Sequence, residues 1–290
     1  MRQKKLKKLG KKIAAIAAIV NVTIKRKLNA QQIYVPVVNG VKVGVSGEKW
    51  MSGVLRELFQ FDKGMFYDVG INLGQTLTKV KTLDPSRKYV GFEPNPSCLF
   101  YLQRLIAANL WGGVLIVPVG LSNIDGLAEL IVSNDTDSGA TIIKNLRSIS
   151  DKSTKLVPVF RYESIQDRLP KNNVSVIKID VEGAEIEVVE TLLPIILRDR
   201  PVIIIEILPI GKEAASLRSA RNKQLVNMLD AAKYAFYRIA KTPDDKYAGV
   251  YRTDLLAYAD PVLKDHIAMP IEKITLLEKV LTIASRGTQL

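Results

Sequence analysis

The sequence predicts an α/β protein with a Rossmann-like, mostly parallel sheet and helices on both of its faces. Apolar runs rich in valine and isoleucine recur along the chain, which is typical of strands buried on both faces. Helix-compatible stretches separate most of these runs, and strands that alternate with helices form parallel sheets. The apolar runs are residues 65–67, 89–92, 115–119, 174–179 and 202–207, and the helical stretches are 75–83, 98–109 and 185–197.

The segments around this alternation are assigned from the same patterns. Short strands and a helix at 50–59 are predicted between residues 33 and 64, and hairpin strands with a polar loop between 127 and 161. A helix at 224–232 and strands at 236–239 and 255–258 follow the fifth run. Residues 31–260 are therefore expected to form one Rossmann-like domain, followed by a helical C-terminal extension at 261–290.

Positive charge is concentrated at the N-terminus. The 290-residue chain has a net charge of +13, but residues 1–47 contain eleven Lys or Arg and no acidic residue, which leaves 31 basic and 29 acidic residues in the rest. This distribution argues against a basic groove for nucleic acid on the folded body. A single cysteine, Cys98, excludes an internal disulfide and a cysteine-based zinc site, and a single histidine, His266, excludes a histidine dyad.

Residues 1–30 are predicted to form a basic amphipathic extension. Their apolar side chains recur at spacings of three and four, as one face of a helix requires, and the apolar stretch 13–20 is too short to span a bilayer. We expect a cytoplasmic protein whose residues 1–27 lie on an anionic membrane surface, at the inner face of the membrane. The alternative is a solvated basic tail. The apolar positions are Leu6, Leu9, Ile13, Ile16 and Val20.

The first apolar run leads directly into the sequence DVGINLG, residues 68–74, and then into a helix. In open α/β sheets a ligand lies beyond the carboxyl ends of the strands and contacts the first turn. Gly70 and Gly74 let the backbone approach a ligand closely, and the free amides at the helix start favour an anionic group. Asp68 and Asn72 complete the predicted cofactor-binding turn.

The second apolar run ends in FEPNP, residues 92–96. Glu93 lies 25 residues after Asp68, where an acidic side chain can accept hydrogen bonds from both hydroxyls of a ribose. Pro94 and Pro96 end the strand and keep Glu93 at its tip. Glu93 and Asn95 are therefore predicted to bind the cofactor.

The spacing of the first turn helps to choose the cofactor. A dinucleotide site expects G-x-G-x-x-G, but here bulky Ile71 and Leu73 lie between the small positions. This arrangement suits a nucleoside cofactor without a pyrophosphate, of which S-adenosylmethionine is the commonest. The alternatives are an NAD-dependent oxidoreductase and a non-catalytic nucleotide-binding module.

An ordered set of motifs resembles the FkbM-type methyltransferases, a Rossmann-like family that uses S-adenosylmethionine. The resemblance spans about residues 66–258 and departs from the family at Ile71, where alanine is usual; it does not cover the N-terminal extension or the last thirty residues. The motifs are DVGINLG at 68–74, FEPNP at 92–96, GLSNIDG at 120–126, IKIDVEGAE at 177–185 and IIIEILP at 203–209.

The resemblance implies the remaining site residues. Gly120, Leu121 and Ser122 follow the third strand, where such enzymes contact the adenine. Asp180 and Glu182 follow the fourth strand and Glu206 lies in the fifth, and these three are predicted to be catalytic, with Asp180 also close to the cofactor. Asp180 or Glu182 would take the proton of an acceptor hydroxyl if burial raises its pKa.

The resemblance also implies the partner, a hydroxyl-bearing glycan or small metabolite, which residues 133–153 would select. Asp180, Glu182 and Glu206 offer the oxygen ligands that Mg²⁺ prefers, but three acids on two strands suit hydrogen bonding alone, so no metal is predicted. Nucleic acid is excluded because DVEG stands where base methyltransferases have an Asn/Asp-Pro-Pro-aromatic run. Aromatic residues make up only 7% of the chain and are not interleaved with basic ones.

Overall fold

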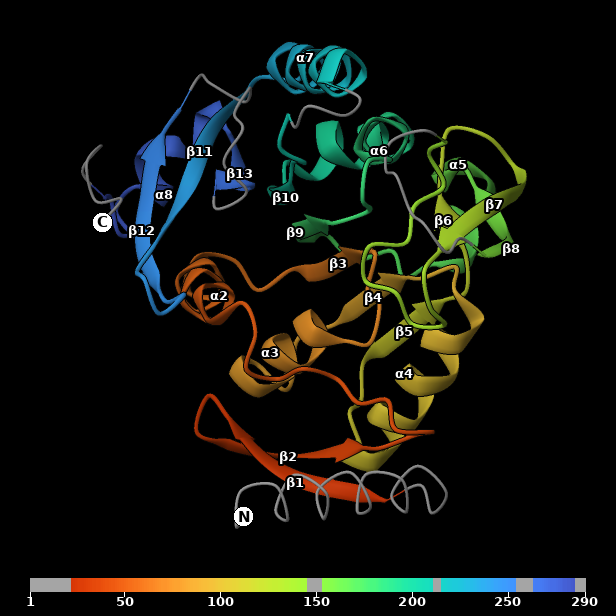
Figure 1. The fold of residues 1–290 in the computed structure, drawn as a ribbon. Coiled ribbons are helices and arrows are strands. Elements are labelled where there is room, and N and C mark those ends of the chain that lie inside the picture. Colours follow the sequence, from red (N-terminus) through yellow and green to blue (C-terminus); the bar gives the residue numbers. More distant parts are fainter. Residues whose placement is uncertain (1–21, 145–152, 211–214, 254–262, 285–290) are drawn as a thin grey trace, which may run out of the picture.

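The structure, a computed structural model, describes residues 22–144, 153–210, 215–253 and 263–284. At its centre lies an eight-stranded sheet (Figure 1), in the order β12-β11-β13-β10-β9-β3-β4-β5. The strands are β3 (Met65–Val69), β4 (Tyr89–Phe92), β5 (Val114–Val117), β9 (Val174–Ile179), β10 (Val202–Glu206), β11 (Tyr234–Lys241), β12 (Tyr247–Arg252) and β13 (Asp265–Pro270).

Five neighbouring strands of this sheet, β5-β4-β3-β9-β10, are parallel, and the other three join antiparallel to their neighbours. The five parallel strands coincide with the five apolar runs of the sequence. Every residue of β3, β4, β9 and β10 is buried, which explains why these strands read as continuous apolar runs and not as alternating ones. The predicted fold class is confirmed.

Helices cover both faces of the sheet (Figure 1). Helices α6 (Glu185–Asp199) and α7 (Ala215–Ala231) lie on one face, and α2 (Lys49–Phe61), α3 (Gln75–Leu83) and α4 (Pro96–Asn109) lie on the other. Alternate residues of β3 point to opposite faces, so that Tyr67 packs in the core on the α6 side and Phe66 in the core on the α2 side. The strand therefore directs Asp68, like Phe66, toward α2 and α3.

The predicted C-terminal boundary near residue 260 is wrong. Residues 261–290 were expected to form a helical extension, but β13 lies inside the central sheet, between β10 and β11. All six of its residues are buried, and its backbone pairs with β10 at Ile204↔Ile267 and with β11 at Phe236↔Ala268. Without β13, the facing edges of two buried strands would lack hydrogen-bond partners, which is costly in a core. A 3-10 helix at Ile271–Lys273 and the short helix α8 (Ile274–Leu277) follow it among the described residues.

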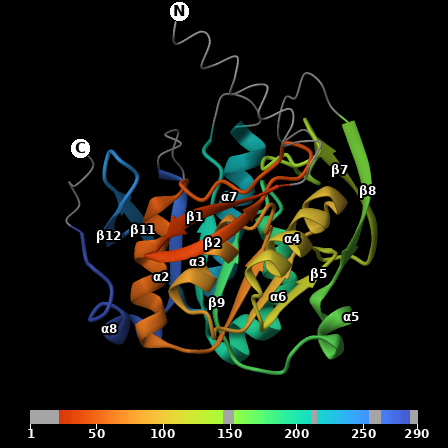
Figure 2. The ribbon, with the colours of Figure 1, turned by 90° about the horizontal axis from the view of Figure 1, so that it is seen from below.

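The predicted N-terminal boundary, between residues 30 and 31, cuts through a β-hairpin. Strands β1 (Thr23–Leu28) and β2 (Gln31–Pro36) form a hairpin that crosses the outer side of α3 and α4 (Figure 2). Ile33 and Val35 pack against α4, so residues 23–36 belong to the folded body. Residues 1–21, with the predicted amphipathic helix, and the predicted strand at 255–258 lie outside the described residues. None of the described helices is long and apolar enough to cross a membrane.

A second, three-stranded sheet stands beside the edge strand β5. Its strands are β6 (Gly120–Leu121), β7 (Gly126–Val132) and β8 (Ser153–Phe160), in the order β6-β8-β7, and the short helix α5 (Tyr162–Ile165) follows it. It contains the hairpin strands expected between 127 and 161. A bridge between Ile131 and Thr141 folds the intervening loop back onto β7. This loop, residues 133–140, reaches the carboxyl ends of the central strands and forms one wall of the site.

Candidate functional site

The carboxyl ends of β3 and β9 mark the place where the strand order reverses. From β3 the chain continues to β4 and β5 on one side, whereas β9 and β10 lie on the other. Such a reversal leaves a crevice between the loops that follow the two strands, where open α/β sheets bind ligands. The loops remain close together at their roots, because the Asp180 amide donates to the Val69 carbonyl oxygen over 3.0 Å.

A first cavity opens in this crevice, with about 630 Å³ of empty space including its mouth. Most of the predicted site residues line it: Gly70, Asn72, Glu93, Asn95, Gly120, Leu121, Asp180 and Glu182.

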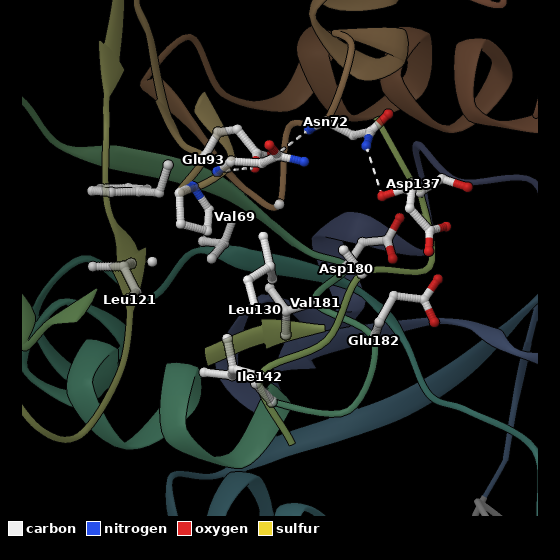
Figure 3. A pocket seen from close by; sticks show the side chains of 18 residues that line it. Val69, Asn72, Glu93, Leu121, Leu130, Asp137, Ile142, Asp180, Val181 and Glu182 are labelled. Atoms are coloured by element: carbon white, nitrogen blue, oxygen red, sulfur yellow. Dashed lines mark hydrogen bonds between the residues drawn. The ribbon is translucent and has the colours of Figure 1, made fainter. Parts of the chain in front are cut away.

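The two ends of this cavity differ in character (Figure 3). Leu121, Leu130 and Val181 form an apolar wall, whereas Asp180 and Glu182 gather on the opposite side. A ligand that fits this cavity therefore combines a flat apolar part at one end with a polar or cationic part at the other.

Glu93 is fixed at the tip of β4 by two backbone amides. Its Oε2 accepts from the Asn72 amide at 2.7 Å and its Oε1 from the Asn95 amide at 2.8 Å. Burial raises the pKa of Glu93 to about 7, although both amide hydrogen bonds oppose this shift. Each oxygen keeps a lone pair for a further donor, as a ribose would supply.

Asn72 and Asn95 hold the 133–140 loop over the cavity. The Asn72 Nδ2 donates to the Asp137 carbonyl oxygen over 3.3 Å, and the Asn95 Nδ2 donates to that of Asp135 over 2.9 Å. Asn72 has a left-handed backbone, with φ of 51°, which is uncommon for a residue other than glycine. Its Oδ1 is buried and has no hydrogen-bond partner in the described structure. A donor group on a ligand would supply the missing hydrogen bond.

Three predicted cofactor residues line neither cavity described here: Asp68, Gly74 and Ser122. Asp68 is fully buried, accepts a hydrogen bond from the Tyr89 hydroxyl and lies 3.9 Å from the Lys178 ammonium. Gly74 is the left-handed N-cap of α3, and the Ser122 amide donates to the Phe160 carbonyl oxygen. We propose that these three residues support the loops instead of contacting the cofactor.

A second cavity adjoins the first and is richer in charge. Glu48, Lys178, Glu206 and Lys264 line it, together with Gln75. The two cavities share five lining residues: Gly70, Asn72, Ser138, Asp180 and Glu182. A group bound in the first cavity can therefore reach one in the second where Asp180 lies.

Carboxylates from three distant parts of the sequence meet in the second cavity. Oxygen atoms of Glu48, Asp180 and Glu206 lie within 4.8 Å of one another. Carboxylates this close can ligate a cation, but Lys178 donates to Asp180 at 2.9 Å and Lys264 to Glu206 at 2.6 Å. These lysines neutralise two of the three charges, so a metal ion is not needed to hold the group together. The set differs from the predicted one, because Glu48 stands in place of Glu182.

Sequence reasoning missed Glu48, Lys178 and Lys264. A signal existed for Lys178, because it is the single charged residue in the strand VSVIKI and lies two positions before Asp180. Glu48 is the first acidic residue of the chain, but nothing local connects it with residues 180 and 206. Lys264 precedes β13, which was assigned to a helical extension.

Comparisons with solved structures give distant similarities. The chain is 15% identical to an FkbM methyltransferase from Methylobacillus flagellatus KT, with a TM-score of 0.42, and the match covers 71% of this chain and 43% of that one. It is 12% identical to an O-methyltransferase from Bacillus cereus in complex with SAH, with a TM-score of 0.44 and coverage of 78% and 80%. It is also 12% identical to Aeropyrum pernix fibrillarin with S-adenosylmethionine bound, with a TM-score of 0.42 and coverage of 86% and 99%. A comparison with curated proteins finds no match.

The comparison with protein families gives a longer and more specific match. The FkbM methyltransferase domain matches residues 68–236, which is more than half of the chain. This range begins at the turn after β3 and includes Glu93, the 133–140 loop, Asp180 and Glu206, the parts from which the first cavity and its junction with the second are built. The chain belongs to the FkbM methyltransferase family.

Proposed function

We propose that this protein transfers a methyl group from S-adenosylmethionine to a hydroxyl group of a small-molecule or glycan acceptor. The observation that carries the proposal is the junction of two cavities at Asp180 and Glu182. One cavity has the shape and polarity for a nucleoside cofactor, and the other is polar and open to an acceptor. Methyl transfer requires the two reactants to meet in line, and this junction would align them.

The first cavity fits S-adenosylmethionine group by group. The fixed carboxylate of Glu93 offers acceptors for two ribose hydroxyls, and Leu121 and Leu130 offer an apolar wall for an adenine. The buried Oδ1 of Asn72 would accept from the ammonium of the methionine moiety. When bound, the cofactor supplies an electrophilic methyl group on a cationic sulfur, and the carboxylates of Asp180 and Glu182 favour that charge.

The second cavity favours an acceptor with hydroxyl groups. It offers acidic acceptors such as Glu48 and donors such as Lys178, Lys264 and Gln75. A neutral polyol or sugar pairs with such a mixture of donors and acceptors, whereas a large apolar molecule would leave buried charges without partners. These charged groups also argue against a non-catalytic binding module, and family membership argues against an NAD-dependent oxidoreductase.

Glu93→Ala should weaken S-adenosylmethionine binding by about 1.5–3 kcal/mol, because two charged hydrogen bonds to the ribose would be lost. Isothermal titration calorimetry on folded protein would measure the change. Glu163→Ala is a matched control, since Glu163 is exposed on α5 and lines neither cavity. An enzyme that binds NAD and not S-adenosylmethionine would contradict the proposal.

We also propose that residues 1–27 hold the enzyme on the inner, cytoplasmic face of an anionic membrane. Three exposed basic residues of β1 (Lys25, Arg26 and Lys27) continue the run of lysines that precedes the hairpin. Each basic residue close to anionic lipid contributes on the order of 1 kcal/mol. The cluster therefore suffices for binding without a lipid anchor.

The full chain should float with phosphatidylserine-containing vesicles at physiological salt and stay unbound with neutral vesicles. Replacing six lysines by glutamine should abolish flotation, because the lipid surface then loses its charged partners. The control variant replaces three exposed lysines of the folded body, Lys42, Lys144 and Lys171, and should float like the native chain. Equal flotation of the six-lysine variant would refute the membrane proposal. The six lysines are Lys4, Lys5, Lys7, Lys8, Lys11 and Lys12.

A further inference from the structure

The carboxylates that line the second cavity differ in the cationic groups that face them. Asp180 receives a 2.9 Å hydrogen bond from Lys178, whose side chain is only 7% exposed. Lys178 remains charged because Asp180 and Asp68 lie on either side of it, and their charges raise its pKa. Asp180 therefore has a buried cationic partner at hydrogen-bond distance.

Glu206 lies in a different environment at the end of β10. Its side chain is 9% exposed, and its cationic partner Lys264 is 37% exposed and thus partly screened by water. Burial, followed by the nearby charge of Asp180, raises the pKa of Glu206 to about 8, although Lys264 opposes this. The carboxyl group of Glu206 therefore exchanges a proton near neutral pH.

Glu48 completes the group from the other side of the cavity. Its backbone is left-handed, with φ of 49°, and its carboxylate lies 3.6 Å from the buried ammonium of Lys79. A left-handed backbone at a residue other than glycine is strained and persists where the surrounding structure holds it. This backbone conformation places the Glu48 side chain in the second cavity, where its carboxylate oxygen lies within 4.8 Å of carboxylate oxygens of Asp180 and Glu206.

Acidic groups outnumber basic ones around this point. Burial and the neighbouring carboxylates favour the protonated form of Glu206. A cation bound at the junction would release that proton, and a neutral ligand would not. The charged groups that face Glu206 directly or through one neighbour are Glu48, Asp68, Lys79, Lys178, Asp180, Glu182, Lys241, Lys264 and Asp265.

We propose that Glu206 carries a proton in the cofactor-free enzyme and accepts the proton of the acceptor hydroxyl once the cofactor is bound, and that Glu48 and Asp180 are positioning residues beside it. This inference rests on the proposed function. As the oxygen–methyl bond forms, the electron pair of the sulfur–methyl bond stays on sulfur and the hydroxyl proton passes to Glu206. Glu206 can accept this proton because binding of a cationic cofactor would already have displaced the proton that Glu206 carried. Glu48 lies outside the residues 68–236 that match the family.

The test compares S-adenosylmethionine with S-adenosylhomocysteine, which is neutral at sulfur. Calorimetric titration of the full chain at pH 7.5, in phosphate and in Tris, gives the number of protons released by each ligand. Any proton lost from Glu93 is common to both ligands, because both carry the ribose. We expect S-adenosylmethionine to release roughly half a proton more, since a group that titrates near pH 8 is mostly protonated at pH 7.5.

Glu206→Gln should abolish this difference and leave S-adenosylhomocysteine affinity within about twofold, because Glu206 does not line the first cavity. Glu48→Gln should reduce the difference, and this variant tests the inference even if Glu206→Gln does not fold. Glu190→Gln, on α6 and outside both cavities, is the control and should behave like the native protein.

Equal proton release by the two ligands in the native protein, or an unchanged difference in Glu206→Gln, would overturn the inference and leave the proposed function intact. Failure of both ligands to bind would instead overturn the proposed function.

Discussion

Gly70→Ala should prevent the chain from folding stably, although it adds a single methyl group. A Cβ at residue 70 would lie 1.9 Å from the backbone oxygen of Asp180. The two loops cannot simply move apart, because they leave neighbouring paired strands and the Asp180 amide is hydrogen-bonded to the Val69 carbonyl oxygen. The backbone at Gly70 also has φ of 87°, which costs an L-residue roughly 1–2 kcal/mol before any clash. We expect the free energy of unfolding to fall by more than about 4 kcal/mol, a loss that few single substitutions cause.

Urea unfolding followed by circular dichroism would measure this loss. Gly112→Ala is the matched control, because its added Cβ would meet no atom within 4 Å, and the free energy of unfolding should change by less than about 0.5 kcal/mol. A Gly70→Ala protein of native stability that fails only to bind S-adenosylmethionine would contradict this prediction. It would mean that Gly70 serves ligand approach, as the sequence alone suggested.

Lys178→Met should destabilise the protein by about 3–5 kcal/mol, the usual cost of breaking a buried ion pair from one side. The carboxylate of Asp68 is completely buried, and its Oδ1 has no hydrogen-bond partner in the described structure. Burial already raises the pKa of Asp68 to about 6, with the charge of Lys178 as the main opposing influence. Without this lysine, the folded protein must either bury an uncompensated charge or keep Asp68 protonated at neutral pH.

The destabilisation caused by Lys178→Met should increase with pH. In the unfolded chain Asp68 ionises near its ordinary value of 3.8, whereas in the folded protein it ionises only near pH 6. A raised carboxyl pKa favours folding at low pH, and this contribution is lost as pH rises through that window. Because removing Lys178 raises the pKa of Asp68 further, the destabilisation should be larger at pH 7.5 than at pH 5. Urea unfolding at both pH values would measure it.

Lys171→Met is the control for Lys178→Met. Lys171 forms a 2.8 Å ion pair with Asp167, but both side chains are exposed to solvent. Exposed pairs contribute little because water and salt screen them, so no measurable change is expected. A loss of stability at Lys171 equal to that at Lys178 would show that burial is not the cause.

Local patterns accounted for the part of the fold that carries the cofactor. A strand buried on both faces must be apolar throughout, so five apolar runs marked the five parallel strands. The turn after the first run and the acid after the second then lay at neighbouring strand ends, because parallel strands end at the same edge of the sheet. The local pattern predicted a helical extension where the chain forms β13. The pairing of this six-residue strand depends on partners about 60 and 30 residues earlier in the chain.

Tertiary contacts also decided what individual residues do. Ile71 departs from the usual alanine of the family, and the structure accommodates it because Gly91 leaves its space free: a Cβ there would lie 2.1 Å from the Ile71 Cδ1. Asn72 and Asn95 line the first cavity, and their side-chain amides also hold the 133–140 loop over it. Such contacts join residues about 20–65 positions apart, a separation at which local periodicity carries no information.

The sequence by itself determined the alternation of strands and helices, the turn at residues 68–74, Glu93 at a strand tip and the family to which the chain belongs. These features depend on neighbours in the chain, whose spacing is set by the geometry of strands and helices. Only the tertiary structure brought Glu48, Asp180 and Glu206 within 4.8 Å of one another, and only it placed Lys178 between two carboxylates. The proton affinity of a buried acid depends on the charges that surround it in space, and for Glu206 those charges come from residues far apart in the sequence.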